Sequence, residues 1–443
     1  MGRKRKEDTI EGSTDNFKEM LDSQCRSALI SGELQTTAQS ESCMIGPRLP
    51  YFCLRYLFQR TTFPFSRTTV LYGEPGCNKS SFLYWLYRLF ADIGGMYLHL
   101  EVETKDSPAN RLAMLGHPKA DKDPGYTKSC QLMDEYQTYT KKYIDWLCKA
   151  FIDNLPPFII GIDSLMGKMT ESAAKVVDDR EGVTGKRYAS EALSLSDWFK
   201  YIPKYLFKRP FCLVGVNHDK PKPGQYANMV LHTMPGGLAP VFSSTYRILF
   251  SKVKTIPQNA SGVTINHIKM VMDRNSIASG KLPIFVDIGF WSEVGKNSKG
   301  KIVSRTCTAW NWHKASAELL LSISNDNGAR SKVVDELIDI KKHTGNLYSS
   351  PNLGIPRSDP VKPTEFGKVL EANTELLELL EARLGIVSGR EYQIGVPYVK
   401  QWEEAVNDVD EFTPLDNASI DAIDDDNVST ESNTDLDTGD NNE

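Results

Sequence analysis

The sequence predicts an α/β fold in which helices cover both faces of a doubly wound, mostly parallel sheet. The first observation behind this prediction is a series of short, continuously apolar segments, which are typical of strands buried on both faces. The second is that helical patterns alternate with these segments along the chain. The third is a glycine-containing turn at residues 73–81, which joins the first clear strand to the helix that follows it.

The predicted strands are short apolar segments, several of them rich in β-branched residues. They span residues 68–74, 96–103, 158–164, 211–217, 246–253, 267–273 and 283–290. Residues 80–91 are predicted to form the helix after the first strand, because aromatic residues and leucines crowd on them. The Leu-rich segment 363–389 is also predicted to be helical.

The length of 443 residues indicates one large domain with appendages, or two domains. Residues 1–45 are polar with one amphipathic stretch, and we expect either an N-terminal polymerisation arm or a small helical element. The strand–helix alternation places the core at residues 46–290, followed by a C-terminal, α-rich region at 291–402. Residues 403–443 are expected to form a disordered acidic tail.

The composition is that of an ordinary globular chain, with 40% hydrophobic and 25% charged residues. No run of eighteen apolar residues predicts a membrane span, and no apolar stretch follows the basic start MGRKRK as a secretory signal would require. The eight cysteines form no CxxC pair, which argues against a zinc site and a disulfide framework. We therefore expect a protein of the reducing cytoplasm, that of the host cell if a phage encodes it.

The charge is unevenly distributed. The whole chain has a net charge of −5, but the segment from residue 403 to 443 holds 15 acidic residues and no Lys or Arg. The remaining residues, 1–402, therefore carry 42 acidic and 52 basic side chains, a net charge of +10. A basic body with an acidic tail suits a protein that binds a polyanion, although the tail is equally explained as a solubilising segment.

The turn at 73–81 has the spacing of a phosphate-binding loop, GxxxxGK[ST], between a strand and a helix. Backbone N–H groups of such a loop point at phosphate oxygens. Lys79 is predicted to reach the β- and γ-phosphates of ATP, and Ser80 to ligate Mg²⁺. The predicted loop consists of Gly73, Glu74, Pro75, Gly76, Cys77, Asn78, Lys79, Ser80 and Ser81. Asn78 replaces the usual glycine, but asparagine tolerates unusual backbone angles better than most residues.

Three polar residues are predicted to complete this site, because each ends a strand at the same sheet edge. Asp163 ends an apolar strand, where an aspartate can orient the Mg²⁺ shell. Glu103 is placed to polarise the attacking water, with Glu101 as a competitor on the same side of its strand. His218 is placed to sense the γ-phosphate, with a strand-capping turn as the alternative.

Two long polar segments, 167–186 and 219–237, do not fit regular elements and follow strands directly. They therefore leave the sheet edge where ligands sit in α/β folds. Basic residues in and next to them can hold a nucleic-acid backbone, although a solvated surface explains any single lysine equally well. The candidate DNA-binding residues are Lys168, Lys186, Arg187, Lys220, Lys222, Gly236 and Gly237.

The order of these motifs resembles that of RecA-type recombinases, in particular the phage branch of that family. The motifs are FPFSRTTVLYGEPGCNKSS, LHLEVETKDSP, IIGIDSLMGKM, GVNHDKPK and MPGGLAPVFSSTYRILF, and they cover about residues 45–290. The resemblance implies a RecA-like P-loop ATPase core. It also implies an ATP- and Mg²⁺-dependent helical filament on single-stranded DNA that pairs this strand with homologous double-stranded DNA in recombination, repair and replication.

By position, the resemblance assigns Glu103 as the catalytic glutamate and His218 as the γ-phosphate sensor. Segments 167–186 and 219–237 match the two DNA-binding loops of the family, and Gly236 and Gly237 match the glycine pair that closes the second loop. Arg274 falls where the family places a basic residue that reaches the nucleotide of the neighbouring subunit. Single-strand-binding and mediator proteins are the implied partners, and no membrane partner is expected.

Two other functions share these motifs. A hexameric helicase motor has the same core, but forms a closed ring and usually carries an arginine finger and an extra helical domain. A filament or mediator paralogue would bind ATP and hydrolyse it poorly, for instance because Asn78 distorts the loop.

Overall fold

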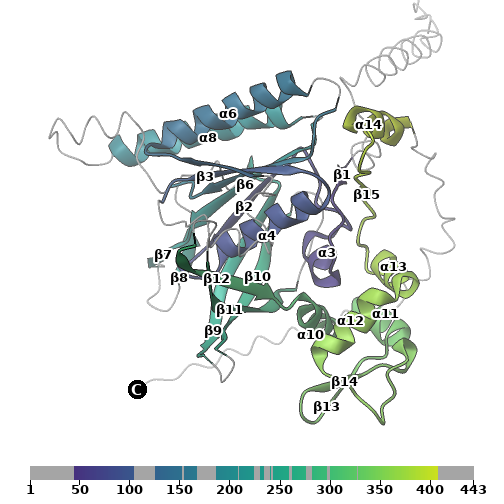
Figure 1. Ribbon diagram of the computed structural model, residues 1–443. Coiled ribbons are helices and arrows are strands. Elements are labelled where there is room, and N and C mark those ends of the chain that lie inside the picture. The colour runs from purple at the N-terminus through teal and green to yellow at the C-terminus, as the bar shows by residue number, and fades with distance from the viewer. Residues whose placement is uncertain are drawn as a thin grey trace, which may run out of the picture. The chain divides into compact units, whose positions relative to one another are not determined.

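The computed structural model describes residues 44–103, 125–151, 154–166, 186–207, 209–223, 230–233, 240, 243–258, 262–275, 282–296, 300–326 and 328–407. Residues 1–43 of the predicted arm, residues 408–443 of the predicted tail, and Lys168, Gly236 and Gly237 lie outside these residues. The expectation of disorder from residue 403 is wrong for residues 403–407, which form the last part of helix α14 (Tyr398–Asn407). Figure 1 shows the arrangement of the helices and strands.

The central element is a sheet that has nine strands within the described part of the chain, in the order β12-β11-β10-β9-β2-β6-β5-β3-β4. The six strands from β4 to β9 in this order pair in parallel, and β9 to β12 pair antiparallel. The strands are β2 (Thr68–Gly73), β3 (Met96–Glu101), β4 (Gly125–Ser129), β5 (Phe158–Asp163), β6 (Phe211–His218), β9 (Tyr246–Ile256), β10 (Thr264–Asn275), β11 (Ile284–Lys296) and β12 (Ile302–Trp310).

Helices cover both faces of the parallel part of the sheet (Figure 1). Leu71 of β2 belongs to a buried cluster with residues of α3 (Phe52–Phe58), α4 (Lys79–Asp92) and α10 (Trp312–Ser324). Its neighbour Val70 belongs to a second cluster with α6 (Met133–Ala150) and α8 (Lys186–Leu206). Because successive strand residues face opposite sides, each strand contributes to both clusters. The prediction of an α/β fold with a large, mostly parallel sheet is confirmed.

The sheet continues beyond the expected core boundary at residue 290, which falls inside β11. β12 then adds an edge strand that the sequence reading did not contain. The other edge strand, β4, was also not predicted. Both segments, IVSRTCTAW and GYTKS, are rich in polar residues and lack the continuous apolar pattern of the inner strands.

The Leu-rich segment 363–389 contains two helices, α12 (Pro363–Ala372) and α13 (Thr374–Arg383). Asn373 separates them, and its side chain accepts a hydrogen bond from the N–H of Leu376 as an N-cap. The remaining elements of this region are α11 (Ala329–Leu337), the β13–β14 hairpin (Lys341–His343 and Leu347–Ser349), the 3₁₀ turn η2 (Pro351–Leu353) and α14 (Tyr398–Asn407).

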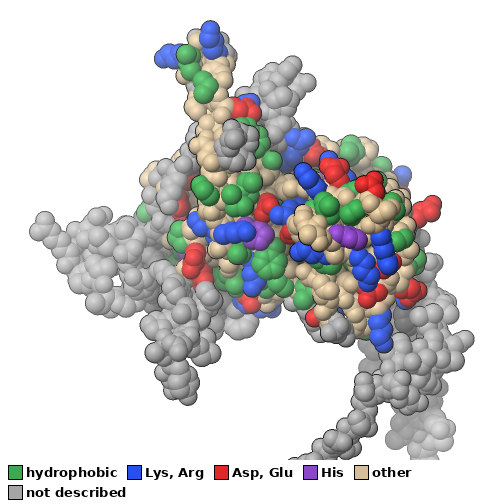
Figure 2. Space-filling view, turned by 90° about the horizontal axis from the view of Figure 1, so that it is seen from below, with side chains coloured by type: hydrophobic (Ala, Val, Ile, Leu, Met, Phe, Trp, Pro, Cys, Tyr) green, Lys and Arg blue, Asp and Glu red, His purple; other side chains and the backbone are tan. Residues whose placement is uncertain are grey.

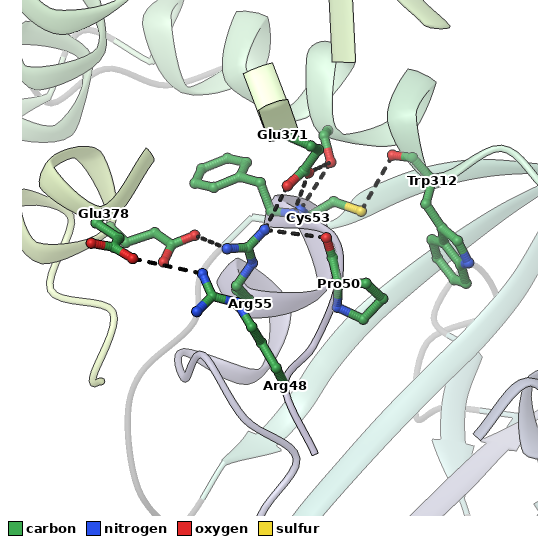
Figure 3. Close-up of polar contacts among 10 residues, drawn as sticks. Arg48, Pro50, Cys53, Arg55, Trp312, Glu371 and Glu378 are labelled. Atoms are coloured by element: carbon green, nitrogen blue, oxygen red, sulfur yellow. Dashed lines mark hydrogen bonds and ion pairs between the residues drawn. The ribbon is translucent and has the colours of Figure 1, made fainter. Parts of the chain in front are cut away.

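Residues near the start of the described chain are tied to this C-terminal region (Figure 3). Strand β1 (Ile45–Gly46) pairs in parallel with β15 (Arg390–Glu391). Arg55 of α3 lies between two carboxylates, 2.5 Å from Glu371 of α12 and 2.8 Å from Glu381 of α13. All three side chains are buried, so these ion pairs join α3 to α12 and α13.

Candidate nucleotide site

The loop between β2 and α4 has positive φ angles at both of its glycines. Gly73 has a φ of 149°, and a Cβ at this position would lie 2.1 Å from the carbonyl oxygen of Phe250. Gly76 has a φ of 77°. Only glycine fits at position 73 without a clash, so the residue type there agrees with the backbone conformation of the loop.

Asn78 has a φ of 67° and a ψ of 25°, the left-handed conformation that glycine usually provides. Asparagine therefore preserves the loop. Its side chain does not cap α4, because its Oδ1 accepts a hydrogen bond from Nδ2 of Asn266, at 3.1 Å. The first N–H groups of α4 thus have no side-chain cap from this residue and can serve an anion.

Lys79 begins α4, and its ammonium group lies under the loop. Its Nζ donates to the carbonyl oxygens of Gly73 and Glu74, at 2.8 Å each, and lies 3.5 Å from the Sγ of Cys77. The side chain is buried. A buried ammonium group that has only neutral acceptors nearby favours an anion in the same loop.

Ser80 and Asp163 meet at the ends of α4 and β5. The Oγ of Ser80 donates to Oδ2 of Asp163, at 2.5 Å. Burial raises the pKa of Asp163, and the hydrogen bond from Ser80 opposes this effect. A cation at this place would favour the ionised carboxylate further. The donor set, one hydroxyl and one carboxylate, fits Mg²⁺, which usually takes one or two protein ligands and completes its shell with water and phosphate oxygens.

Glu103 lies beside Asp163 at the same sheet edge. Its Oε1 is 2.5 Å from Nε2 of His218 and accepts a hydrogen bond from the Oγ of Ser164, at 2.8 Å. His218 ends β6 and pairs with Gly73 of β2 in the sheet register. The Nδ1 of His218 is buried and has no hydrogen-bond partner within the described ranges. The sequence reading named both residues, but not their contact or that with Ser164.

Glu101, the competitor of Glu103, lies in the interior. Its Oε2 is 3.0 Å from Nε2 of the fully buried His99, and Nδ1 of His99 is 2.9 Å from the hydroxyl of Tyr87. The alternation of His99 and Glu101 with apolar residues in β3 could have indicated this pairing. Of the two glutamates, Glu103 is the one at the edge with Ser80 and His218.

The segment after β6 is hydrogen-bonded directly to the first residue of the predicted phosphate-binding loop. The N–H of Asp219 donates to the carbonyl oxygen of Gly73, at 3.0 Å, and this oxygen also accepts from Lys79. The irregular segment expected at 219–237 contains a short hairpin, β7 (Lys220–Pro223) and β8 (Val230–Thr233). The prolines in this segment hid the strand pattern from the sequence prediction. They are tolerated in the β7–β8 pair because both strands are edge strands.

The predicted DNA-binding residues are only partly described. Lys186 and Arg187 are the first residues of α8, so the segment expected to be irregular ends in a helix. Lys220 and Lys222 lie in β7. The side chains of these four residues lie outside the described part of the structure.

Arg274 lies away from the predicted phosphate-binding loop. It pairs with Arg247 between β10 and β9, and Arg247 pairs with Val70 near the start of β2. The P-loop follows the opposite end of β2. Arg247 also donates to Asp273, at 2.5 Å, and Asp273 accepts from the hydroxyl of Tyr72, at 2.6 Å. The sequence reading missed this cluster.

A scan against protein-family models finds no match for this chain, and a comparison with curated proteins finds no relative. Among the residues with described positions, no helix is long and apolar enough to span a membrane. The same residues contain no group of three or more His, Cys, Asp or Glu side chains that could hold a metal ion.

Proposed function

We propose that this chain is a Mg²⁺-dependent ATPase of the RecA type that acts in DNA strand exchange. The observation that carries the ATPase part is the convergence of Lys79, Ser80, Asp163, Glu103 and His218 at one edge of the parallel sheet. Two hydrogen bonds, Ser80 to Asp163 and His218 to Glu103, join side chains of α4, β5, β6 and the segment that follows β3.

In this proposal the loop N–H groups and Lys79 hold the β- and γ-phosphates of ATP. The Nζ of Lys79 leaves the carbonyl oxygens of Gly73 and Glu74 for phosphate oxygens, which are stronger acceptors because they are charged. Ser80 would be a ligand of Mg²⁺, and Asp163 would orient the water shell of the metal. The bound metal would supply neutralisation of the phosphate charge.

Glu103 polarises the attacking water, and His218 reports whether the γ-phosphate is present. Because Glu103 and His218 are hydrogen-bonded to each other, Glu103 cannot act on water while His218 holds it. When His218 turns toward a γ-phosphate, it releases Glu103, and Glu103 can then accept a proton from water. Because Asp219 is bonded to Gly73, a movement of His218 also changes the start of the segment 219–237. This is how nucleotide state would reach a DNA-binding segment.

The DNA part of the proposal is supported by the net charge of +10 in residues 1–402 and by the position of the segments 167–186 and 219–237 after β5 and β6. Binding would be electrostatic and largely independent of sequence. The position of Arg274 at the opposite end of the sheet supports a role toward the nucleotide of a neighbouring subunit. Such a head-to-tail contact builds an open helical filament.

The test is ATP hydrolysis by the full chain with and without single-stranded DNA, together with electron micrographs of the same samples. We expect DNA-stimulated hydrolysis and helical filaments. Lys79→Ala should abolish both, whereas Lys368→Ala, at an exposed position on α12, should change neither. Closed rings would favour a helicase motor, and ATP binding without DNA-stimulated hydrolysis would favour a mediator paralogue. Strand exchange that persists in Lys79→Ala would contradict the proposal.

A further inference from the structure

A hollow of about 520 Å³ lies between strands β9–β11, helix α10 and the β13–β14 hairpin. We call it the lysine hollow, because Lys254, Lys314 and Lys342 line it from three different elements. On the face shown in Figure 2, the visible histidine side chains lie among basic, acidic and apolar side chains. The volume lies within the ~300–1,000 Å³ range of small-molecule sites.

The floor of the hollow is a preorganised polar network. Asp287 accepts from Nζ of Lys314 through Oδ2, and its Oδ1 lies near Nδ1 of His267, both at 2.7 Å. Lys314 also lies 3.5 Å from Glu318. Burial alone would raise the pKa of Asp287, but its bonds with Lys314 and His267 lower it. Asp287 is therefore a satisfied carboxylate that orients the lysine and the imidazole.

Two features of the network point toward a ligand. The Nε2 of His267 has no hydrogen-bond partner among the residues that the structure describes. Lys254 and Lys342, which are exposed, have no ion-pair partner in the same set. Three lysines thus face two carboxylates, Asp287 and Glu318, and both carboxylates are already engaged by Lys314. The hollow consequently has donors in excess of acceptors.

The walls add flat apolar surface. The imidazole of His267 stacks on the ring of Phe285, with 5.7 Å between centroids and 11° between planes. Ile256, Leu321 and Tyr348 add further apolar or aromatic surface, and the polar residues Ser322 and Asn346 complete the lining. Apolar walls with a few convergent charged donors recognise an organic anion better than they recognise a bare ion.

We propose that the lysine hollow is a binding site for a small organic anion, in which a phosphate or carboxylate meets Lys254 and Lys342 and a flat apolar group lies against His267 and Phe285. This site is separate from the P-loop. It lies on the other face of β10, because adjacent strand residues point to opposite sides and His267 follows Asn266, the residue bonded to Asn78.

The link through Asn266 gives the ligand a way to affect the P-loop. The side chain of Asn266 holds Asn78, and the next residue, His267, holds Asp287 in the hollow. A ligand that shifts His267 therefore shifts the strand segment that supports the left-handed turn at Asn78. This coupling, unlike the binding itself, rests on the proposed nucleotide function.

The binding test is calorimetric titration of the full chain with phenyl phosphate at low ionic strength, without nucleotide. We expect saturable binding that weakens about tenfold or more in the double variant Lys254→Ala/Lys342→Ala. Matched controls are Lys252→Ala and Lys341→Ala, which remove neighbouring lysines outside the hollow and should leave affinity unchanged. Inorganic phosphate should bind more weakly than phenyl phosphate, because it has no group for the apolar wall.

Three results would overturn the proposal: no saturable binding to the wild type, equal binding to the double variant, or binding of a single-stranded oligonucleotide without any binding of phenyl phosphate. Binding of the oligonucleotide alone would make these lysines part of a surface that binds a nucleic-acid backbone. For the coupling, phenyl phosphate should change the affinity for MgATP by about fivefold or more. Asn266→Ala should abolish that change and keep phenyl phosphate binding. A chain that binds phenyl phosphate but no MgATP would refute the proposed function and the coupling, and leave the site intact.

Discussion

The Nε2 of His218 lies 2.5 Å from the Oε1 of Glu103, and this contact joins the ends of β6 and β3 across the intervening strand β5. The same Glu103 oxygen accepts from Ser164, so the carboxylate is held by both neighbours. In the proposed mechanism this is the state in which Glu103 is not available to water. In that mechanism, hydrolysis and sensing would both depend on this one hydrogen bond.

Replacing Glu103 with glutamine should therefore abolish hydrolysis and preserve ATP binding. An amide cannot accept the proton of water, and the loss should be about 100-fold or more in kcat. Steady-state hydrolysis and equilibrium binding of a fluorescent ATP analogue measure the two effects. Glu101→Gln is the matched control two residues away. If Glu101→Gln lost more kcat than Glu103→Gln, the catalytic carboxylate would be that of Glu101 and the assignment of Glu103 would be wrong.

Asn78→Gly should retain the loop, whereas Asn78→Val should disrupt it. Glycine adopts the φ of 67° at no steric cost, but a β-branched residue is strained there by about 1–2 kcal/mol. Thermal unfolding and nucleotide affinity measure the outcome. Similar behaviour of the two variants would contradict the left-handed conformation of Asn78.

The pH dependence of stability should reflect Glu381. Burial raises the pKa of Glu381 to about 7, and the ion pair with Arg55 opposes this only in part. A raised pKa in the folded state stabilises the protein at pH values below the ordinary glutamate pKa, and this contribution is lost as pH rises through 7. The effect is on the order of 3 kcal/mol.

Glu381→Gln should consequently flatten the curve of unfolding free energy against pH between pH 5 and 8, as measured by urea unfolding. The exposed Glu378, on the same helix, provides the control Glu378→Gln, which should keep the slope of the wild type. If Glu381→Gln kept the wild-type slope of unfolding free energy against pH, another titrating group would be responsible for the pH dependence.

Gly161→Ala should destabilise the fold, while Gly295→Ala should not. A Cβ on Gly161 would lie 1.8 Å from the hydroxyl of Tyr87, within the packing between β5 and α4, whereas a Cβ on Gly295 would meet nothing within 4 Å. We expect a loss of about 1–3 kcal/mol for Gly161→Ala and less than about 0.5 kcal/mol for Gly295→Ala. Equal midpoints in urea unfolding would contradict this packing.

Removing residues 408–443 should strengthen binding to double-stranded DNA at low salt. The removed segment carries 13 of the 15 acidic residues found from residue 403 onward, and in the proposed function it would compete with DNA for the basic body. Fluorescence anisotropy at two salt concentrations measures the change, which should shrink as salt screens the charges. Unchanged affinity would leave the tail with a solubilising role alone.

The sequence predicted the inner strands because burial on both faces leaves a strong local pattern, and it predicted the turn from β2 to α4 from its glycines. It placed Glu103, Asp163 and His218 at one edge from their positions at strand ends alone. It missed β4 and β12, because edge strands carry polar residues. It also missed the contacts of Glu103 with Ser164 and of Asn78 with Asn266, since these join residues far apart in sequence and depend on the order of strands in the sheet.

The pairing of β1 with β15 has a practical consequence. Ile45, at the beginning of the described body, and Glu404, near its end, line the same hollow. Domains whose ends lie close together usually tolerate circular permutation. A short linker from Asn407 to Met44 would close the body, and new termini could then open at the β11–β12 turn. Such a permutant would lack the residues before Met44 and after Asn407. Its activity would show what the site does without those two segments.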